Sequence, residues 1–174
     1  MAVKPFEKKT KNKKAIIIGH GGAAKAAIFA LASAGYQKVK VFNRTYKKIK
    51  NIKNPHKTII ENYKLEAFKD HTHDADIIIN TIPINILKKI KDLKLKPSTI
   101  GFDVVYNPKK GTGFLDDFKS KKRIGGIHML VHQAVPCWNA WFAGPRAEVE
   151  TGLIKALFRK MEEIYGAGKN AIGQ

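Results

Sequence analysis

Short β-branched runs alternate with longer helical stretches along most of the chain. Residues 15–19 form a continuous apolar run ending in glycine, which is typical of a strand buried on both faces. Ala, Ile, Phe and Leu at helical spacing predict a helix over residues 23–34, with Gly35 as its stop. The same pattern predicts four further strands, at residues 39–43, 58–61, 76–80 and 99–105.

Strands separated by helical segments imply right-handed crossovers. The pattern therefore predicts an α/β, Rossmann-like, doubly wound and mostly parallel sheet with helices on both faces. A helical C-terminal tail should follow, because two apolar stripes recur there at helical spacing, and we expect both to join the core. The first stripe is Leu130, Val131, Ala134, Val135, Trp138, Trp141 and Phe142, and the second is Leu153, Ile154, Leu157, Phe158, Met161, Ile164 and Tyr165.

The length of 174 residues fits one domain with an extra helix or two. No apolar run reaches the roughly 18 residues of a membrane span, and the N-terminus lacks the apolar stretch of a secretory signal. The single cysteine, Cys137, agrees with a reducing compartment, so we expect a cytoplasmic protein.

The basic charge is concentrated in the first third of the chain. The sequence holds 33 Lys and Arg against 14 Asp and Glu, a net charge of +19, and residues 1–60 hold 15 of these bases against the single acid Glu7. Most bases are lysines, whereas nucleic-acid readers usually rely on arginine. We interpret most of the lysine as solvated surface and expect the rest to bind an anion.

The segment Gly-His-Gly-Gly-Ala-Ala-Lys-Ala at residues 19–26 lies between the first strand and the first helix. Gly19 permits a tight turn, Gly21 lets backbone approach a pyrophosphate, and small residues let the helix N-terminus point free N–H groups at the anion. The spacing favours dinucleotide binding over an ordinary glycine turn.

The second strand ends with Asn43, Arg44 and Thr45, where an NAD-binding fold would carry an acid for the ribose hydroxyls. Arg44 suits a ribose 2′-phosphate, and Lys47 and Lys48 follow closely. The charge predicts NADP as the cofactor, although Arg44 read alone could be a solvated charge.

Four motifs together resemble the shikimate dehydrogenase family, specifically its C-terminal NADP-binding domain. They are the glycine loop, NRT at 43–45, DVVYNP at 103–108 and GIHMLVHQA at 126–134, and the likeness covers residues 14–165.

The resemblance implies a role for each matching position. Tyr106 and Gln133 match the positions through which this domain touches the shikimate ring, although from the residues alone either could be structural. The implied cofactor contacts are Gly19, His20, Gly21, Gly22 and Ala23 for the pyrophosphate; Asn43, Arg44, Thr45, Tyr46, Lys47 and Lys48 for the adenosine phosphate; and Thr81, Val104, Gly126 and Met129 for the nicotinamide.

Two positions depart from the family pattern. Asn85 replaces a turn glycine and is expected to tolerate positive φ, and His128 replaces a glycine, adding an imidazole near the nicotinamide pocket. His132 lies beside Gln133, and we favour a surface position for it over one near the substrate. We expect no metal site.

The family's substrate domain, with its Lys/Asp pair and Ser-x-Ser, has no counterpart in the sequence. Residues 1–13 form a basic leader and 166–174 a flexible tail, so we expect no catalytic residue in this chain and little or no shikimate oxidation by it alone. Shikimate or 3-dehydroshikimate would bind only with a substrate domain supplied, by a separate chain for example.

Three functions remain open at this point. They are the NADP-binding half of a shikimate dehydrogenase-like enzyme, a non-catalytic NADP module or sensor, and a lysine-rich nucleic-acid binder. In the first case the tail helices should expose apolar area around Trp138, Trp141 and Phe142, or bury it in a homo-oligomer.

Overall fold

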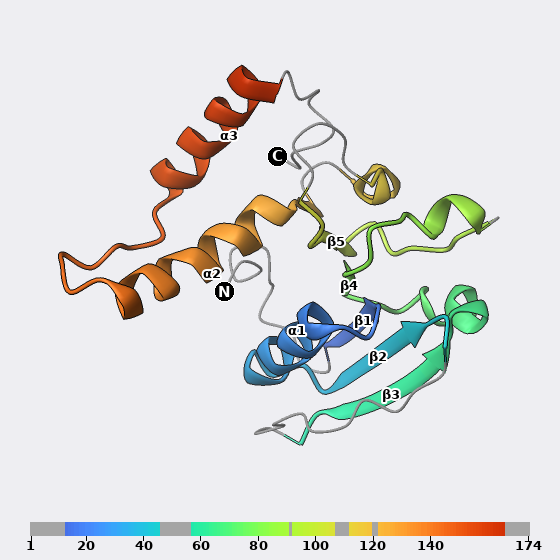
Figure 1. Ribbon diagram of the computed structural model, residues 1–174. Coiled ribbons are helices and arrows are strands. Elements are labelled where there is room, and N and C mark those ends of the chain that lie inside the picture. Colours follow the sequence, from blue (N-terminus) through green and yellow to red (C-terminus); the bar gives the residue numbers. More distant parts are fainter. Residues whose placement is uncertain (1–12, 46–56, 91, 107–111, 120–121, 166–174) are drawn as a thin grey trace.

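A six-stranded parallel sheet forms the centre of the molecule in the computed structural model, which describes residues 13–45, 57–90, 92–106, 112–119 and 122–165. Its spatial order is β3-β2-β1-β4-β5-β6, so successive strands are added toward one edge as far as β3 and, from β4 on, toward the other edge (Figure 1). This confirms the predicted Rossmann-like fold. The strands are β1 (Lys14–Ile18), β2 (Lys38–Asn43), β3 (Ile59–Lys64), β4 (Ile77–Asn80), β5 (Ile100–Asp103) and β6 (Arg123–Ile124).

All five predicted strands are present, and a sixth is added. The strand β6 escaped prediction because it has two residues, one of them the half-buried Arg123, and so shows no apolar run. The strand β3 extends to Lys64, beyond its predicted end at residue 61, because an edge strand exposes side chains that periodicity does not mark as buried.

Different elements cover the two faces of the sheet. The helix α1 (Gly22–Ser33) buries Ala24, Ile28 and Leu31 against one face. On the other face, short 3₁₀ helices stand where longer crossover helices were expected. They contribute Phe68, Leu87, Phe114 and Leu115 to a second core cluster, and they are η2 (Leu65–His71), η3 (Leu87–Lys89) and η4 (Phe114–Asp117).

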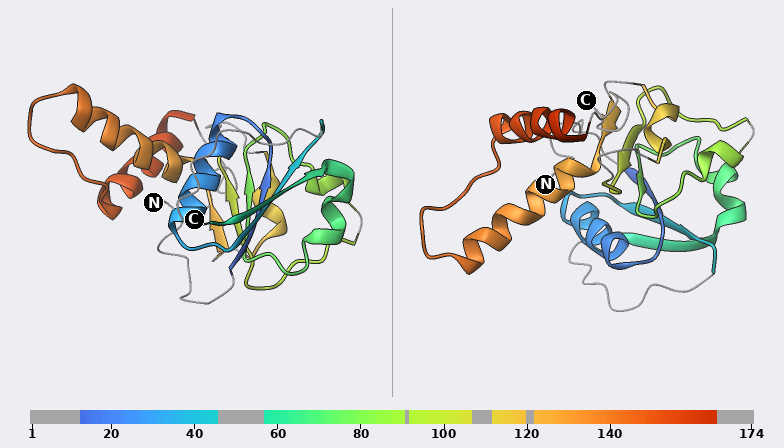
Figure 2. Two further views of the ribbon diagram at one scale, coloured as in Figure 1. Left: turned by 90° about the horizontal axis from the view of Figure 1, so that it is seen from below. Right: turned by 45° about the horizontal axis from the view of Figure 1, so that its top comes forward.

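The helix α2 (Gly126–Trp141) begins against the sheet and continues beyond it (Figure 2). Ile127 and Val131 are buried, where α3 (Thr151–Tyr165) packs back with Met161. The expectation that the whole first stripe is core is wrong, because the outer half of α2 extends past the sheet. The exposed large side chains are Leu130, Trp138, Trp141 and Phe142.

This exposure confirms the expected apolar surface near the tail helices. The second stripe is divided. Met161 is buried, and Ile154, Leu157 and Phe158 are partly buried against the cluster that it forms with Ile127 and Val131, whereas Leu153 and Ile164 are exposed. Within the described ranges, no helix combines the length and apolar character that crossing a bilayer requires.

Candidate functional site

The glycine loop joins β1 to α1 and lies open on one side. Gly19 has φ +113°, and a Cβ there would overlap the Thr81 side chain, so the turn requires glycine. A Cβ at Gly21 or Gly22 would meet nothing within 4 Å. Since α1 begins at Gly22, the N–H groups of Gly22, Ala23 and Ala24 have no partner within the helix and face this open side.

His20 occupies the loop beside these groups. Its Nε2 is buried and has no hydrogen-bond partner among the described residues, although the residue as a whole is half-buried. A buried imidazole nitrogen without a partner is costly, so this atom is suited to a polar group supplied from outside the chain.

The end of β2 lies directly against this loop. The N–H of Gly19 donates to the carbonyl of Phe42 at 2.8 Å, and Asn43 follows Phe42. The Asn43 side chain donates to the Thr45 carbonyl at 2.9 Å and so shapes the turn that presents the exposed Arg44. Tyr46, Lys47 and Lys48 lie outside the described residues.

Two further loops meet at the same edge of the sheet. Thr81 follows β4, and both its N–H and its hydroxyl donate to the Ile18 carbonyl, at 2.9 and 2.7 Å. Val104 follows β5 and donates its N–H to the Asn80 carbonyl at 2.9 Å. The carboxyl ends of β1, β4 and β5 therefore form one edge, where open α/β sheets bind ligands.

The start of α2 is held tightly against this edge. A Cβ at Gly126 would lie 2.7 Å from the Val104 carbonyl oxygen and 2.9 Å from the carbonyl of Val105. Because backbone cannot move aside as a side chain can, glycine is required for α2 to approach the loop after β5. The next turn of α2 then carries Met129 over the sheet.

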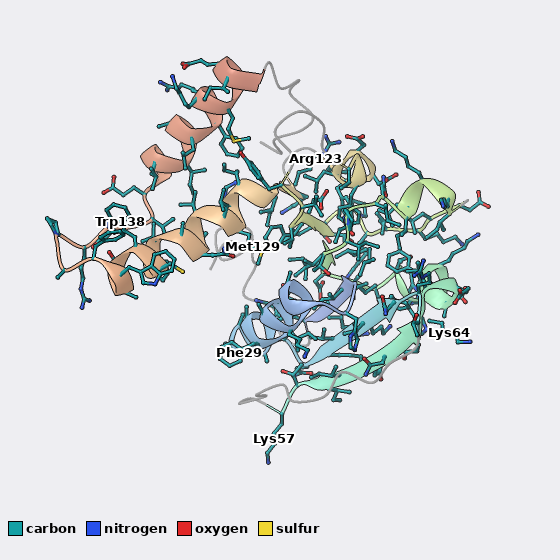
Figure 3. The ribbon with its side chains drawn as sticks, viewed as in Figure 1. Phe29, Lys57, Lys64, Arg123, Met129 and Trp138 are labelled. Atoms are coloured by element: carbon teal, nitrogen blue, oxygen red, sulfur yellow. The ribbon has the colours of Figure 1, made fainter. Side chains whose placement is uncertain are left out.

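A cavity of about 250 Å³ lies between α1 and α2. It contains the predicted residues Val104, Met129 and Gln133, and Figure 3 shows Met129 on the side of α2 that faces α1. Its walls are predominantly apolar, which suits the face of a flat ring. The remaining lining residues are Ala26, Ala27, Ala30, Leu31, Ile79, Phe102 and His132.

Tyr106 lies apart from this cavity. Its ring is 40% exposed, and its hydroxyl donates to the Met161 sulfur of α3 at 3.3 Å. The structure therefore brings Val104, Met129 and Gln133 together and places Tyr106 on the side of the edge that α3 approaches.

Asn80 and Asp103 fall at the carboxyl ends of β4 and β5, where the sequence pattern predicts ligand binding, but the sequence assigned neither of them a role. Both are buried, and the Asn80 amide donates to Asp103 at 3.0 Å, linking the ends of β4 and β5. Desolvation raises the pKa of the Asp103 carboxyl, and hydrogen bonds from Thr112, Val105 and Asn80 act against that rise. The signal available in the sequence was the polar residue that closes each of these apolar strands.

Sequence comparison identifies the family. The sequence model described as "Shikimate / quinate 5-dehydrogenase" matches residues 1–91, which is more than half of the chain. The chain belongs to this family. Both the glycine loop and the Arg44 turn lie within the matched residues.

Curated relatives agree with this assignment. The chain is 36% identical over 141 residues to the shikimate dehydrogenase (NADP(+)) of Caldicellulosiruptor saccharolyticus, covering 76% of this chain and 50% of the relative. It is 35% identical over 167 residues to that of Caldicellulosiruptor bescii, covering 91% and 57%. The chain thus spans about half the length of the curated relatives it matches.

Solved structures of shikimate and quinate dehydrogenases share the fold. Shikimate dehydrogenase 1 from Peptoclostridium difficile matches with a TM-score of 0.61 and 26% identity, covering 94% of this chain and 59% of that one. The quinate dehydrogenase of Corynebacterium glutamicum, solved in complex with NAD, matches with a TM-score of 0.67, covering 93% and 57%. Its 20% identity supports the fold alone.

The two departures from the shikimate dehydrogenase pattern take other roles than expected. Asn85 does not adopt positive φ. Its side chain instead donates to the Gly113 carbonyl and accepts from the Leu87 N–H, both at 2.9 Å, which ties the loop after β4 to the segment before η4.

His128 packs against Phe158 of α3, with ring centroids 5.8 Å apart. His132 is half-buried and lines the cavity. One helical turn separates the two residues, so His128 lies nearer the start of α2, beside Phe158, and His132 lies one turn further along. Burial lowers the pKa of both imidazoles, which favours their neutral forms.

Proposed function

We propose that this chain binds NADP(H) and is the cofactor-binding part of a shikimate dehydrogenase-like oxidoreductase. The observation that carries the proposal is the hydrogen bond from Gly19 to Phe42, which joins the open glycine loop to the turn presenting Arg44. A pyrophosphate and an adenosine phosphate are parts of one molecule, and these two binding elements adjoin.

The described residues fit this cofactor from end to end. Gly22 and Ala23, at the start of α1, would offer the pyrophosphate backbone N–H groups that have no partner within the helix, and Gly19 and Gly21 would let it approach the loop. The His20 Nε2 lies beside them and has no hydrogen-bond partner among the described residues. Thr81, Val104, Gly126 and Met129 would surround the nicotinamide, which supplies hydride donor and acceptor chemistry when bound. Asn43, Arg44 and Thr45 would hold the adenosine phosphate, with Tyr46, Lys47 and Lys48 next in the chain.

The choice of NADP over NAD rests on Arg44. The two Caldicellulosiruptor relatives are named as NADP(+) enzymes, whereas the quinate dehydrogenase structure contains NAD, so the family alone does not decide. In this chain the end of β2 carries an exposed guanidinium and no acid, which favours a 2′-phosphate by charge.

Substrate chemistry would require a second structural unit. We assign contacts with shikimate or 3-dehydroshikimate to Gln133, which lines the cavity, and to Tyr106, which lies apart from it on the side that α3 approaches. The exposed apolar surface at the end of α2 supports a partner, either a chain carrying a substrate domain or a second copy.

Binding is tested by titrating NADPH, NADH and a short DNA duplex at two salt concentrations. We expect NADPH to bind more tightly than NADH, with weak salt dependence. Tighter NADH binding would contradict the role of Arg44, and tight duplex binding that collapses with salt would favour a nucleic-acid binder instead.

Turnover gives a separate test of the half-enzyme assignment. The isolated chain should show little or no NADP-dependent shikimate oxidation, because no proton partner for the substrate is assigned among its residues. Clear turnover in a clean preparation would show that the chain is catalytically sufficient.

A further inference from the structure

Asp103 is a buried carboxylate at the end of β5. It is 4% exposed, and three groups donate to it. Its Oδ1 accepts from the Asn80 amide at 3.0 Å and from the Val105 N–H at 3.1 Å, while its Oδ2 accepts a short hydrogen bond from the Thr112 hydroxyl.

These hydrogen bonds continue into three separate segments. The Asn80 amide also donates to the Ile82 carbonyl at 2.9 Å, which fixes the loop after β4. The Thr112 hydroxyl accepts from the Phe114 N–H at 3.1 Å, which anchors the start of η4. One carboxylate therefore ties the loop after β4, the loop after β5 and the approach to η4 to the same point.

Burying this hydrogen-bonded carboxylate costs desolvation free energy, which a residue that only stabilised the fold would not require. All three donors are neutral, and no cation pairs with Asp103 in the part of the chain that the structure describes. A buried carboxylate held only by neutral donors contributes less to stability than an apolar side chain of similar size would. What the network does supply is a fixed geometry for the loops that carry Thr81 and Val104.

We propose that Asp103 is a positioning residue that holds the loops after β4 and β5 in the geometry that receives the nicotinamide end of the cofactor. The inference rests on the proposed function. Asp103 lies on the strand face opposite Phe102 and the cavity, so it acts through these loops and does not itself contact the ring.

The test separates the two ends of the cofactor. NADPH and 2′,5′-ADP, which lacks the nicotinamide, are titrated against the wild type, Asp103→Ala and Asp103→Asn. For Asp103→Ala we expect about tenfold weaker NADPH binding and a change of less than about twofold for 2′,5′-ADP, because Arg44 and the glycine loop are untouched. Asp103→Asn retains an acceptor oxygen and should recover part of the loss.

Thr112→Val keeps the shape of the side chain and removes one donor to Asp103. It therefore tests the positioning role even if Asp103→Ala does not fold. It should weaken NADPH binding about threefold, and Thr112→Ser should restore it. The matched control is Thr99→Val, which removes the hydrogen bond from a buried threonine to the Ala75 carbonyl at the other end of β5. This control should lower the free energy of unfolding, but it should not weaken NADPH binding more than 2′,5′-ADP binding.

The outcomes are distinguishable. If the wild type binds neither ligand, the proposed function fails. If the wild type binds both and the variants at Asp103 and Thr112 bind NADPH equally well, the positioning role is overturned. Equal weakening of both ligands would also overturn it, since that is the result of a general loss of structure.

Discussion

Two apolar stretches of this chain have opposite fates. Ile16, Ile17 and Ile18 in β1 are at most 1% exposed, whereas Trp138 and Trp141 near the end of α2 are 52% and 76% exposed. Both stretches are strongly apolar in sequence. The difference is that β1 has a strand on either side and a layer over each face, while the outer half of α2 lies beyond the sheet (Figure 3). We call the sheet and the layers that cover it the body, and we call α2 and α3 (residues 126–165) the arm. Burial of apolar side chains in the body therefore provides most of the stability, whereas the arm exposes apolar side chains to solvent.

The largest effect is expected when one large side chain is truncated to alanine in each region. Leu31→Ala in the body should lower the free energy of unfolding by about 3 kcal/mol, because Leu31 is 1% exposed and its removal leaves a cavity. Trp141→Ala removes a larger side chain but should cost less than about 1 kcal/mol, because most of it is already in water. Urea unfolding followed by circular dichroism measures both. Equal losses would show that the arm is as tightly packed as the body.

A pair of glycines sharpens the comparison. Gly126→Ala should destabilise by about 2 kcal/mol, because the new Cβ meets backbone atoms of Val104 and Val105. Gly152→Ala in α3 meets nothing within 4 Å and should stabilise by about 0.5 kcal/mol through helix propensity. The thermal midpoints of the two variants should therefore move in opposite directions. A neutral Gly126→Ala would mean that α2 can shift away from the sheet.

Recognition of the 2′-phosphate should depend on the body alone. Arg44→Gln should weaken NADPH binding about tenfold and leave NADH binding nearly unchanged, because it removes a charged partner of the 2′-phosphate. The exposed Lys89→Gln, which removes the same charge elsewhere, is the control. Trp141→Ala should bind NADPH as the wild type does. Isothermal titration provides all four comparisons.

The smallest effect concerns pH and the contact between the arm and the body. Burial lowers the pKa of His128. As the pH falls, the unfolded chain therefore takes up a proton at His128 near pH 6.5, whereas the folded chain takes it up only at lower pH. Stability should therefore be fully present above pH 6.5 and fall as the pH drops below it. His128→Gln should reduce this fall, leaving the part due to His132, whose pKa burial also lowers. Thermal midpoints at pH 5.5 and 7.5 measure the change, and an unchanged pH dependence in His128→Gln would contradict it.

Local chemistry made the body predictable from the sequence. Backbone geometry and charge limit what two of its segments can do. A glycine loop after a buried strand favours an anion at the following helix N-terminus, and a strand ending in Asn43 and Arg44 favours a phosphate over a hydroxyl. The gathering of Val104, Met129 and Gln133 at one cavity followed from the family resemblance, and helical spacing alone would not have found it.

The features that the sequence did not reveal depend on distant partners. The apolar stripe of α2 cannot itself indicate how far the helix runs past the sheet. The bond between Asp103 and Thr112 joins residues with no periodic relation. The surroundings of His128 and His132 depend on where α3 and α1 pack against α2, since His128 contacts Phe158 of α3 and His132 lines the cavity beside α1.

The close contact at Gly126 also fixes the point about which α2 can tilt, and this point lies at the edge of the sheet formed by the carboxyl ends of β4 and β5. The helix has 16 residues and is therefore roughly 24 Å long. A rotation of about one degree at Gly126 displaces the Trp141 end by roughly 0.4 Å on that length. Met129 lies in the same helix, one turn from Gly126, whereas Pro136 lies between Met129 and the tryptophan end. A displacement of the tryptophan end is therefore divided between a tilt of the first turns of α2, which carry Met129, and bending of the helix at Pro136.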